Sequence, residues 1–143
     1  MKKRVWLTRA LTFGMAVLSM PTLALAQATL VKLQSPGEHT GAGVVVPVTV
    51  ACMDPSRGAD LEVQLSQDLG DDQANGEGDL DLDNDPEACA SIPETVSVLV
   101  RPAPDSPSFI LGKASATATL DACDAAFQNC NMLTDEQFIN IID

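Results

Sequence analysis

The sequence predicts an all-β protein, an antiparallel β-sandwich of two packed sheets. Residues 43–52 alternate valines with other residues, so that one face of an extended chain carries valines and ends in a cysteine. Residues 60–66 alternate apolar and polar side chains, the pattern of a strand with one buried and one wet face. Further short alternating runs follow, separated by turns that contain glycine or proline, and this spacing favours two packed sheets.

The strands expected after the first 26 residues are short, and each ends at a turn signal. Pro47 cannot donate a ladder hydrogen bond, so its strand is expected to be an edge there or to carry a bulge. Pro36 and the three prolines between residues 102 and 107 mark turns or extended links. The expected strands are residues 29–34, 43–52, 60–66, 95–101, 109–111 with 114–120, and 137–142.

The C-terminal part has two interpretations. The spacing of Thr134 and Gln137 resembles a helix capping box, so a short helical turn is one expectation for residues 138–142. A last strand over residues 137–142 is the other, and we expect it because the run is short and rich in isoleucine. Such an apolar end strand can complete its own sandwich or add to the sheet edge of a partner.

The first 26 residues have the pattern of a cleaved signal peptide. A basic start at residues 2–4 precedes an apolar run over residues 11–25, and Ala24-Leu25-Ala26 is a small-residue cleavage site. We expect cleavage after Ala26, a single mature domain over residues 27–143, and a secreted or periplasmic location. The apolar run is too short and too broken for a membrane span of roughly 20 residues.

The expected mature chain is strongly acidic. Four of the eight basic residues and none of the twenty acidic ones lie within residues 1–26, which leaves 117 residues with a formal charge of −16. This charge disfavours nucleic acid and anionic membranes as partners and favours cations or basic proteins. Solubility alone is the other explanation of such a charge.

The mature part contains four cysteines, an even number in an exported chain, which predicts two disulfides with three alternative pairings. We favour Cys52–Cys89 and Cys123–Cys130. If the last two are bonded, residues 121–130 must form a loop or broken turn, because a continuous helix would separate them by about 10 Å along its axis. A zinc site is the competing interpretation, but no cysteine pair has close ligand spacing and His39 is the only histidine.

The region from residue 29 to residue 66 resembles bacterial immunoglobulin-like modules. Its opening Leu33-Gln34-Ser35-Pro36, then Gly41 and the valine-rich strand, carry the resemblance. The resemblance implies an immunoglobulin-like β-sandwich at the cell surface. Residues 124–130 also share the acid, the alanine and the cysteine of the late-strand pattern, with Gln128 at the tyrosine position, and this match would imply a Cys52–Cys130 pair.

Residues 67–87 are acidic and interrupted by glycine and asparagine, so we expect a long acidic loop. Within it, Asp79, Asp81, Asp83 and Asp85 place carboxylates at about 7 Å spacing on an extended chain, and Asn84 adds an amide oxygen. A curved loop could bring these oxygens onto one Ca²⁺ ion, which takes about six to eight oxygen ligands. A solvated loop without a site is the alternative.

Known calcium motifs match this run only in part. In the helix-loop-helix frame that starts at Asp79, Asn84 stands where glycine is expected and Ala90 where the closing glutamate is expected. The run followed closely by Cys89 is similar to thrombospondin type 3 calcium repeats, in one partial copy. Ca²⁺ is therefore an expectation from acid density rather than from a complete motif.

The sequence favours a non-enzymatic module for binding or surface assembly, stabilised by calcium through the acidic loop. The alternative is a small periplasmic binding or inhibitor protein whose acidic loop engages a basic partner. An enzyme is the third hypothesis. A serine–histidine–aspartate arrangement would need His39, which lies among loop glycines, and the mature chain lacks the Trp and Tyr platforms common in sugar sites.

Overall fold

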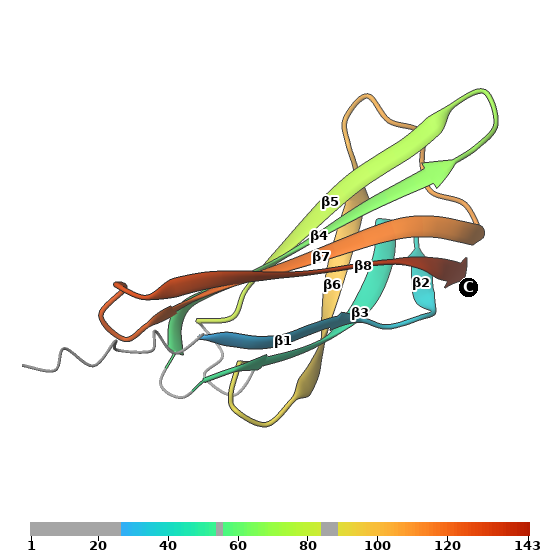
Figure 1. Ribbon diagram of the computed structural model, residues 1–143. Helices are drawn as coiled ribbons and strands as arrows, with labels where there is room; N and C mark the ends of the chain where they lie inside the picture. The colour runs from blue at the N-terminus through green and yellow to red at the C-terminus, as the bar shows by residue number, and fades with distance from the viewer. Residues whose placement is uncertain (1–26, 54–55, 84–88) are drawn as a thin grey trace, which may run out of the picture.

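The computed structural model describes residues 27–53, 56–83 and 89–143, and every helix or strand element in these ranges is a β-strand. The expected leader, residues 1–26, lies outside the described residues. None of the described residues form a helix of the length and apolarity that a bilayer crossing requires. The strands are β1 Ala28–Leu33, β2 Gly37–Thr40, β3 Gly43–Cys52, β4 Ser56–Asp68, β5 Gln73–Asp81, β6 Glu94–Pro102, β7 Gly112–Asp124 and β8 Cys130–Ile142 (Figure 1).

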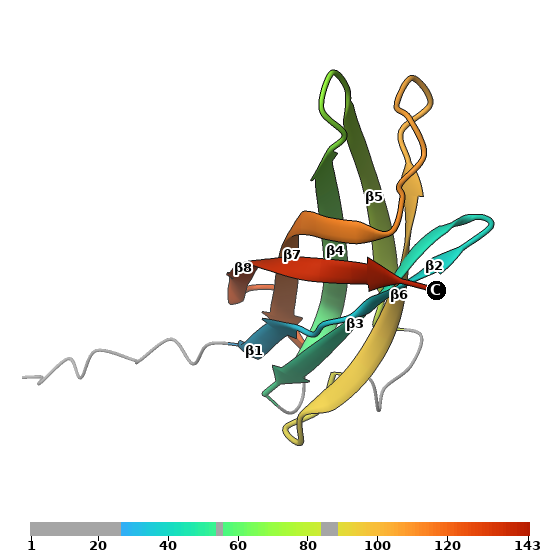
Figure 2. The same ribbon diagram turned by 90° about the vertical axis from the view of Figure 1, so that its right-hand side faces the viewer.

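The all-β class is confirmed, and the backbone ladders of the described strands close on themselves. β3 pairs with β6 along one edge, while its other edge pairs first with β2 and then with β1. Seven strands, in the order β2, β3, β6, β5, β4, β7 and β8, form a closed barrel, completed by a parallel pairing of β2 with β8. All other pairings are antiparallel. Figures 1 and 2 show β4, β5, β7 and β8 side by side, with β3 and β6 crossing on the other side.

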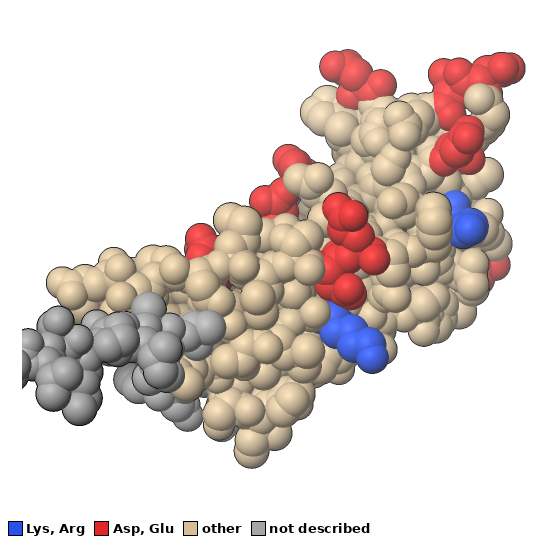
Figure 3. All heavy atoms as spheres, viewed as in Figure 1, with Lys and Arg blue, Asp and Glu red and all other residues tan. Residues whose placement is uncertain are grey.

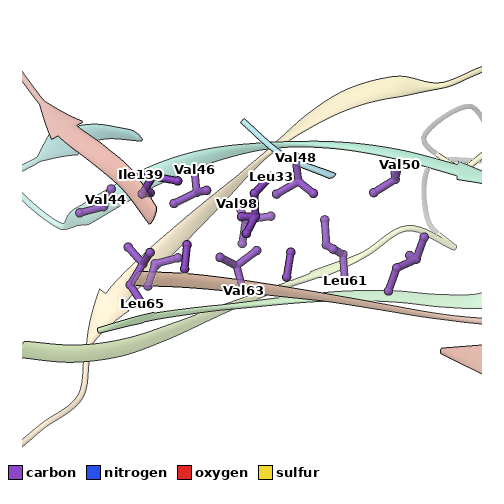
Figure 4. Close-up of a cluster of buried hydrophobic side chains, with 14 of the residues drawn as sticks. Leu33, Val44, Val46, Val48, Val50, Leu61, Val63, Leu65, Val98 and Ile139 are labelled. Atoms are coloured by element: carbon purple, nitrogen blue, oxygen red, sulfur yellow. The ribbon is translucent and has the colours of Figure 1, made fainter. Parts of the chain in front are cut away.

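The core lies between these two groups of strands and consists of alternate aliphatic side chains. Val44, Val46, Val48 and Val50 of β3 are fully buried, as the strict alternation of the sequence predicts. They face the inward side chains of β4, among them Leu61, Val63 and Leu65 (Figure 4). Each such side chain contributes about 1.5–3 kcal/mol when it leaves water, so this layer is the main source of the fold's stability.

The expected acidic loop over residues 67–87 is wrong for most of its length. Gln67 and Asp68 end β4, and Gln73–Asp81 forms β5, which pairs with β4 over nine residues. Ala74, Gly76 and Gly78 point inward, while the polar residues between them point out. Glycine is required at positions 76 and 78 because the backbone of β6 lies against them, and not because the chain turns there.

The short helical turn expected near the C-terminus is also wrong. Residues 130–142 form β8, which pairs with β7 from Cys130 to Ile141. The last strand was predicted at residues 137–142, and it begins seven residues earlier because the β7 ladder satisfies the backbone from Cys130 onward. The capping-box residues Thr134 and Gln137 are ordinary strand residues on opposite faces.

Residues 109–111, an expected strand, are not part of any ladder. Phe109 is buried in the core, and Gln67 at the end of β4 takes the place of a neighbouring strand. The Gln67 side-chain amide donates to the Ile110 carbonyl at 2.9 Å, and the Ile110 N–H donates back to Gln67 Oε1 at 2.9 Å. One buried side chain therefore satisfies the backbone that a strand would have paired.

The favoured disulfides are confirmed. Cys52 at the end of β3 bonds to Cys89, and Cys123 bonds to Cys130 across the β7–β8 hairpin. The Cys52–Cys130 pair that the immunoglobulin-like resemblance implied is not formed. Two disulfides, with no free cysteine among the described residues, indicate an oxidising, exported environment.

Pro47 lies at the point where β3 changes partner. On one side, β2 pairs as far as Val45, and β1 pairs from Val48 onward. The Pro47 carbonyl accepts from the Gln34 N–H at 2.9 Å, so the missing proline N–H also faces this junction. β3 is therefore an interior strand. Its proline removes no ladder hydrogen bond, because pairing with β2 has ended and pairing with β1 has not yet begun at this position.

Candidate functional site

The surface that carries most of the predicted chemistry is the outer face of β5, β4, β7 and β8, called here the outer face. Alternate residues of each strand point to it, and the register aligns them in rows. Asp60 on β4 stands opposite Asp81 on β5 and Asp121 on β7. In the next row Glu62 stands opposite Asp79. Five carboxylates thus occupy two neighbouring rows of three strands.

The electrostatics of these rows are unfavourable to the carboxylates themselves. The pKa of Asp60 is raised above its ordinary value, first by partial burial and then by the negative charges of its neighbours. The neighbours that raise this pKa are Asp81, Asp83, Asp121 and Asp79, in decreasing order. Like charges directly opposite one another destabilise a sheet, so a positively charged ligand or partner would relieve this repulsion.

The structure brings together only part of the predicted calcium set. Asp79 and Asp81 are exposed on β5 and point to the outer face, whereas Asn84 and Asp85 lie outside the described residues. The Asp83 carboxylate accepts backbone N–H groups of Gly58 at 2.7 Å and Ala59 at 3.0 Å.

Asp83 therefore holds the start of β4 against the end of β5. Its own N–H donates to Asp81 Oδ1 at 2.8 Å, which continues this local network. Within the described residues, no group of three or more His, Cys, Asp or Glu side chains has an arrangement that could hold a metal ion. The acid rows are an electrostatic surface rather than a formed coordination cage.

Asp60 and Asp121 were not among the predicted site residues, although their charge environment makes them part of the acid rows. The alternation of residues 60–66 places Asp60 on the wet face and could have pointed to it. The position of Asp121 follows from the β4–β7 register, in which Asp60 pairs with Asp121 after a β-bulge. A bulge shifts the register by one residue, and the sequence gives no local signal of it.

Two surface hollows adjoin the acid rows toward the other end of the outer face. One, of about 360 Å³, is lined by polar residues of β4, β5 and β7, including Gln64, Asn75 and Thr117. The other, of about 600 Å³, lies beside Lys113 and Phe138. The Lys113 ammonium lies 3.9 Å from the centre of the Phe138 ring, a cation–π contact on an aromatic side chain that is 65% exposed.

His39, the only candidate for a catalytic triad, lies on β2 away from these rows. Its Nε2 is 3.1 Å from the Phe109 carbonyl oxygen, which makes Nε2 the donor. It borders a hollow of about 440 Å³ together with Arg101 and Ser108. The structure thus gives this histidine a backbone carbonyl as partner, in place of the carboxylate and hydroxyl that a triad requires.

The charged groups visible in Figure 3 are mostly acidic, and Lys and Arg side chains are few on that side of the molecule. Comparison with protein-family models, curated proteins and solved structures finds no match for this chain.

Proposed function

We propose that the protein is an exported, non-enzymatic binding module that engages a basic protein partner through the acid rows of its outer face. The fold supports a module of the immunoglobulin-like β-sandwich type. The strands β1, β3 and β6 lie across the buried core from β8, β7, β4 and β5, which is how the two layers of such sandwiches face one another, while the ladders of this chain also close into a barrel. Two disulfides stabilise this scaffold at the cell surface or in the periplasm.

The alignment of carboxylates across strands carries this proposal. Asp60, Asp81 and Asp121 share one cross-strand row, and Glu62 and Asp79 share the next. Such rows lower the stability of the sheet, and a binding function is a reason for a protein to keep them. A basic surface would be steered toward them and would neutralise charges that repel one another in the free protein.

The test uses a lysine-rich nonapeptide as the probe of basic character. Binding to the mature protein at low ionic strength should weaken at least tenfold between about 50 and 300 mM NaCl, because screening shortens the range of exposed charges. The double variant Glu62→Gln/Asp79→Asn should lose most of the affinity. A matched variant, Glu94→Gln/Asp105→Asn, removes the same charge away from the acid rows and should bind nearly normally. Equal loss in both variants would show a response to net charge alone.

Attraction of Ca²⁺ to the acid rows is a second candidate, supported by the negative charge that Asp81, Asp60 and Asp121 bring to one row. Carboxylate oxygens are the ligands that this ion prefers. The melting temperature should rise with Ca²⁺ and fall with a chelator at constant ionic strength, and Asp81→Asn should abolish the response. An equal response to Mg²⁺ and to added NaCl would remove the calcium site and leave only screening.

A further inference from the structure

β8 has one edge that is paired along its length and one edge that, among the described strands, is open over much of its length. Its paired edge makes a continuous antiparallel ladder with β7. The Asp124 N–H donates to the Asn129 carbonyl at 3.0 Å, so this pair is hydrogen-bonded, and the bonding alternates from there. Even-numbered residues of β8 therefore direct their N–H and C=O groups away from β7. Asn140 shows this directly, because its N–H donates to Ser35 Oγ at 3.2 Å.

The nearest strand on that side, β1, does not complete the ladder. Inward-pointing side chains of β8 bind its backbone instead. Asp135 Oδ2 accepts from the Leu33 N–H at 2.8 Å, and the Gln137 side-chain amide donates to the Leu33 carbonyl at 2.6 Å. Nearer the start of β8, Asn131 binds both the N–H and the C=O of Ala28.

These contacts place β1 beneath the sheet and not beside it. β1 packs against β7 as well as β8, which a strand continuing the sheet beyond the β8 edge could not do, since neighbouring strands are about 4.8 Å apart. The edge of β8 is consequently open in the plane of the sheet. Figure 2 shows β7 on one flank of β8 and β1 and β3 on the other.

The open stretch runs from Met132 to Phe138, a length of roughly 20 Å at about 3.3 Å per residue. Beyond it, Gly37 and Glu38 of β2 pair in parallel with Ile141 and Ile142, so this same edge already accepts a strand at its far end. A partner strand would extend along the line that β2 begins.

The side chains beside the open edge are exposed and chemically mixed. Met132 is 63% exposed and Phe138 is 65% exposed, one at each end. Thr134 and Glu136 lie between them, also exposed. An open edge of this length is a site for strand addition unless it is protected, and here an inward charge at Asp135 and an outward charge at Glu136 discourage pairing with an identical edge.

We propose that the open edge of β8, from Met132 to Phe138, binds an extended basic segment of a partner protein as an additional β-strand. This rests on the proposed function, because the segment belongs to the basic partner that the acid rows attract. A second copy of the chain is disfavoured by its formal charge of −12, or −16 after loss of the leader. The segment should carry Lys or Arg beside Glu136 and apolar side chains beside Met132 and Phe138.

The experiment uses the synthetic heptapeptide Thr-Val-Thr-Lys-Thr-Val-Thr, in which valine, lysine and valine alternate with threonines. Its matched control has the same sequence with N-methyl groups on alternate residues, which removes the ladder donors and keeps the side chains and charge. The unmodified peptide should bind at least tenfold more tightly than the control. Hydrogen exchange should slow at the amides of Met132, Thr134, Glu136 and Phe138 when it binds.

Thr134→Pro tests the same edge from the protein side. Thr134 pairs with Thr119 at a position without ladder bonds to β7, so proline removes only the donor that faces the open edge. Peptide binding should fall at least tenfold, while Thr134→Val, which keeps the donor, should bind normally. An unchanged melting temperature verifies that the proline variant is folded.

Other outcomes would overturn the inference and separate it from the proposed function. If both peptides bind equally and Glu62→Gln/Asp79→Asn abolishes binding, the acid rows alone bind, and the open edge does not. If neither peptide binds at low salt while the lysine-rich nonapeptide does, the open edge is not a binding site and the acid rows alone bind. If the same amides are protected without peptide, in a dimer detected by sedimentation, the edge pairs with a second copy instead.

Discussion

At the residue scale, the pKa of Asp60 responds to the negative charges gathered on the outer face. It lies at the middle of three strands, and its pKa is raised by partial burial and by four neighbouring aspartates. The folded state therefore disfavours its ionised form. At pH values below the ordinary pKa, the carboxyl is protonated in both the folded and the unfolded state and does not lower the free energy of unfolding. As the pH rises through the raised pKa, the carboxyl ionises in the folded state and the free energy of unfolding decreases.

We therefore expect Asp60→Asn to stabilise the protein at neutral pH by about 0.5 kcal/mol, the scale of a cross-strand like-charge contact. The gain should shrink as the pH falls toward 3, where the wild-type carboxyl is protonated. Urea unfolding at pH 7 and at pH 3 measures both values. Asp105→Asn, in the exposed β6–β7 connection, serves as the control. A gain of equal size at both pH values would contradict the charge argument.

Asp124 is the opposite case, because its pKa is lowered. Its carboxylate accepts the Gln128 N–H at 2.9 Å, the Asn129 side-chain amide at 2.6 Å and the Ala126 N–H at 3.0 Å. The stability that it adds is present above the ordinary pKa and is lost as the pH falls through the lowered pKa.

Asp124→Ala should lower the melting temperature at pH 7 and should leave a smaller difference from wild type near pH 2. Thermal unfolding with the Cys123–Cys130 disulfide intact measures this difference at the two pH values. Asp124→Asn keeps part of the acceptor capacity, so its melting temperature at pH 7 should lie between those of the wild type and of Asp124→Ala. A difference that does not depend on pH would point to lost turn geometry rather than to the charge.

At the scale of an element, β5 depends on glycines that its neighbour requires. A Cβ at Gly76 would collide with the Arg101 carbonyl oxygen, and one at Gly78 would collide with that of Leu99. Both carbonyls belong to the backbone of β6, which cannot move without breaking its ladder with β3. The close approach of β5 to β6 closes the barrel on this side.

Gly78→Ala should thus destabilise the fold by about 1–3 kcal/mol, the usual cost of overpacking a core. Gly41→Ala is the matched control, since a Cβ there meets nothing within 4 Å, and it should change stability little. Denaturant unfolding compares the two variants. Equal effects of the two substitutions would contradict the contact with β6 as the source of the cost, because the entropy of the unfolded chain alone favours alanine over glycine.

β1 is held against β8 by side chains of β8 that form hydrogen bonds with the β1 backbone. Asn131→Ala removes an acceptor for the Gln27 and Ala28 N–H groups and a donor to the Ala28 carbonyl. We expect a loss of about 1–3 kcal/mol, because partly buried backbone groups lose their partners. Hydrogen exchange should quicken first in β1. Asn140→Ala, on an exposed side chain of the same strand, should have little effect.

The elements that the sequence predicts well are those whose inward residues are large. β3 alternates valines, and its expected bounds, residues 43–52, match the structure. β5 alternates as strictly, but its inward residues are Ala74, Gly76 and Gly78. Small residues facing inward are indistinguishable from loop glycines until the neighbouring backbone is known, so the sequence predicted a loop there.

The candidate site was predictable only in part for a related reason. Asp79 and Asp81 were expected to share a face, and they do, because alternation along one strand is a local property. Their meeting with Asp60 and Asp121 depends on pairing between strands far apart in the chain. Asp83 was expected as a ligand, but backbone N–H groups of Gly58 and Ala59 occupy its carboxylate.

At the scale of the whole molecule, the buried valine core stabilises the folded state, while the negative charge of the surface destabilises it. The full chain has twenty acids and eight bases, and the outer face concentrates some of those acids in adjacent rows. Self-repulsion of this kind favours expansion of the chain, whereas the buried aliphatic layer and two disulfides resist it. Stability should therefore respond to ionic strength throughout the molecule and not only at one site.

We expect the melting temperature of the mature protein to rise by several degrees between about 10 and 500 mM NaCl, because the screening length falls from roughly 30 Å to a few ångströms. The double variant Glu62→Gln/Asp79→Asn should show a smaller rise, since part of the repulsion is already removed. At matched ionic strength CaCl₂ and NaCl should act alike if the acid rows are only a charged surface, and CaCl₂ should act more strongly if they bind the ion. A melting temperature that falls with salt would mean that attractive ion pairs dominate the surface, which would contradict the electrostatic basis of binding to a basic partner.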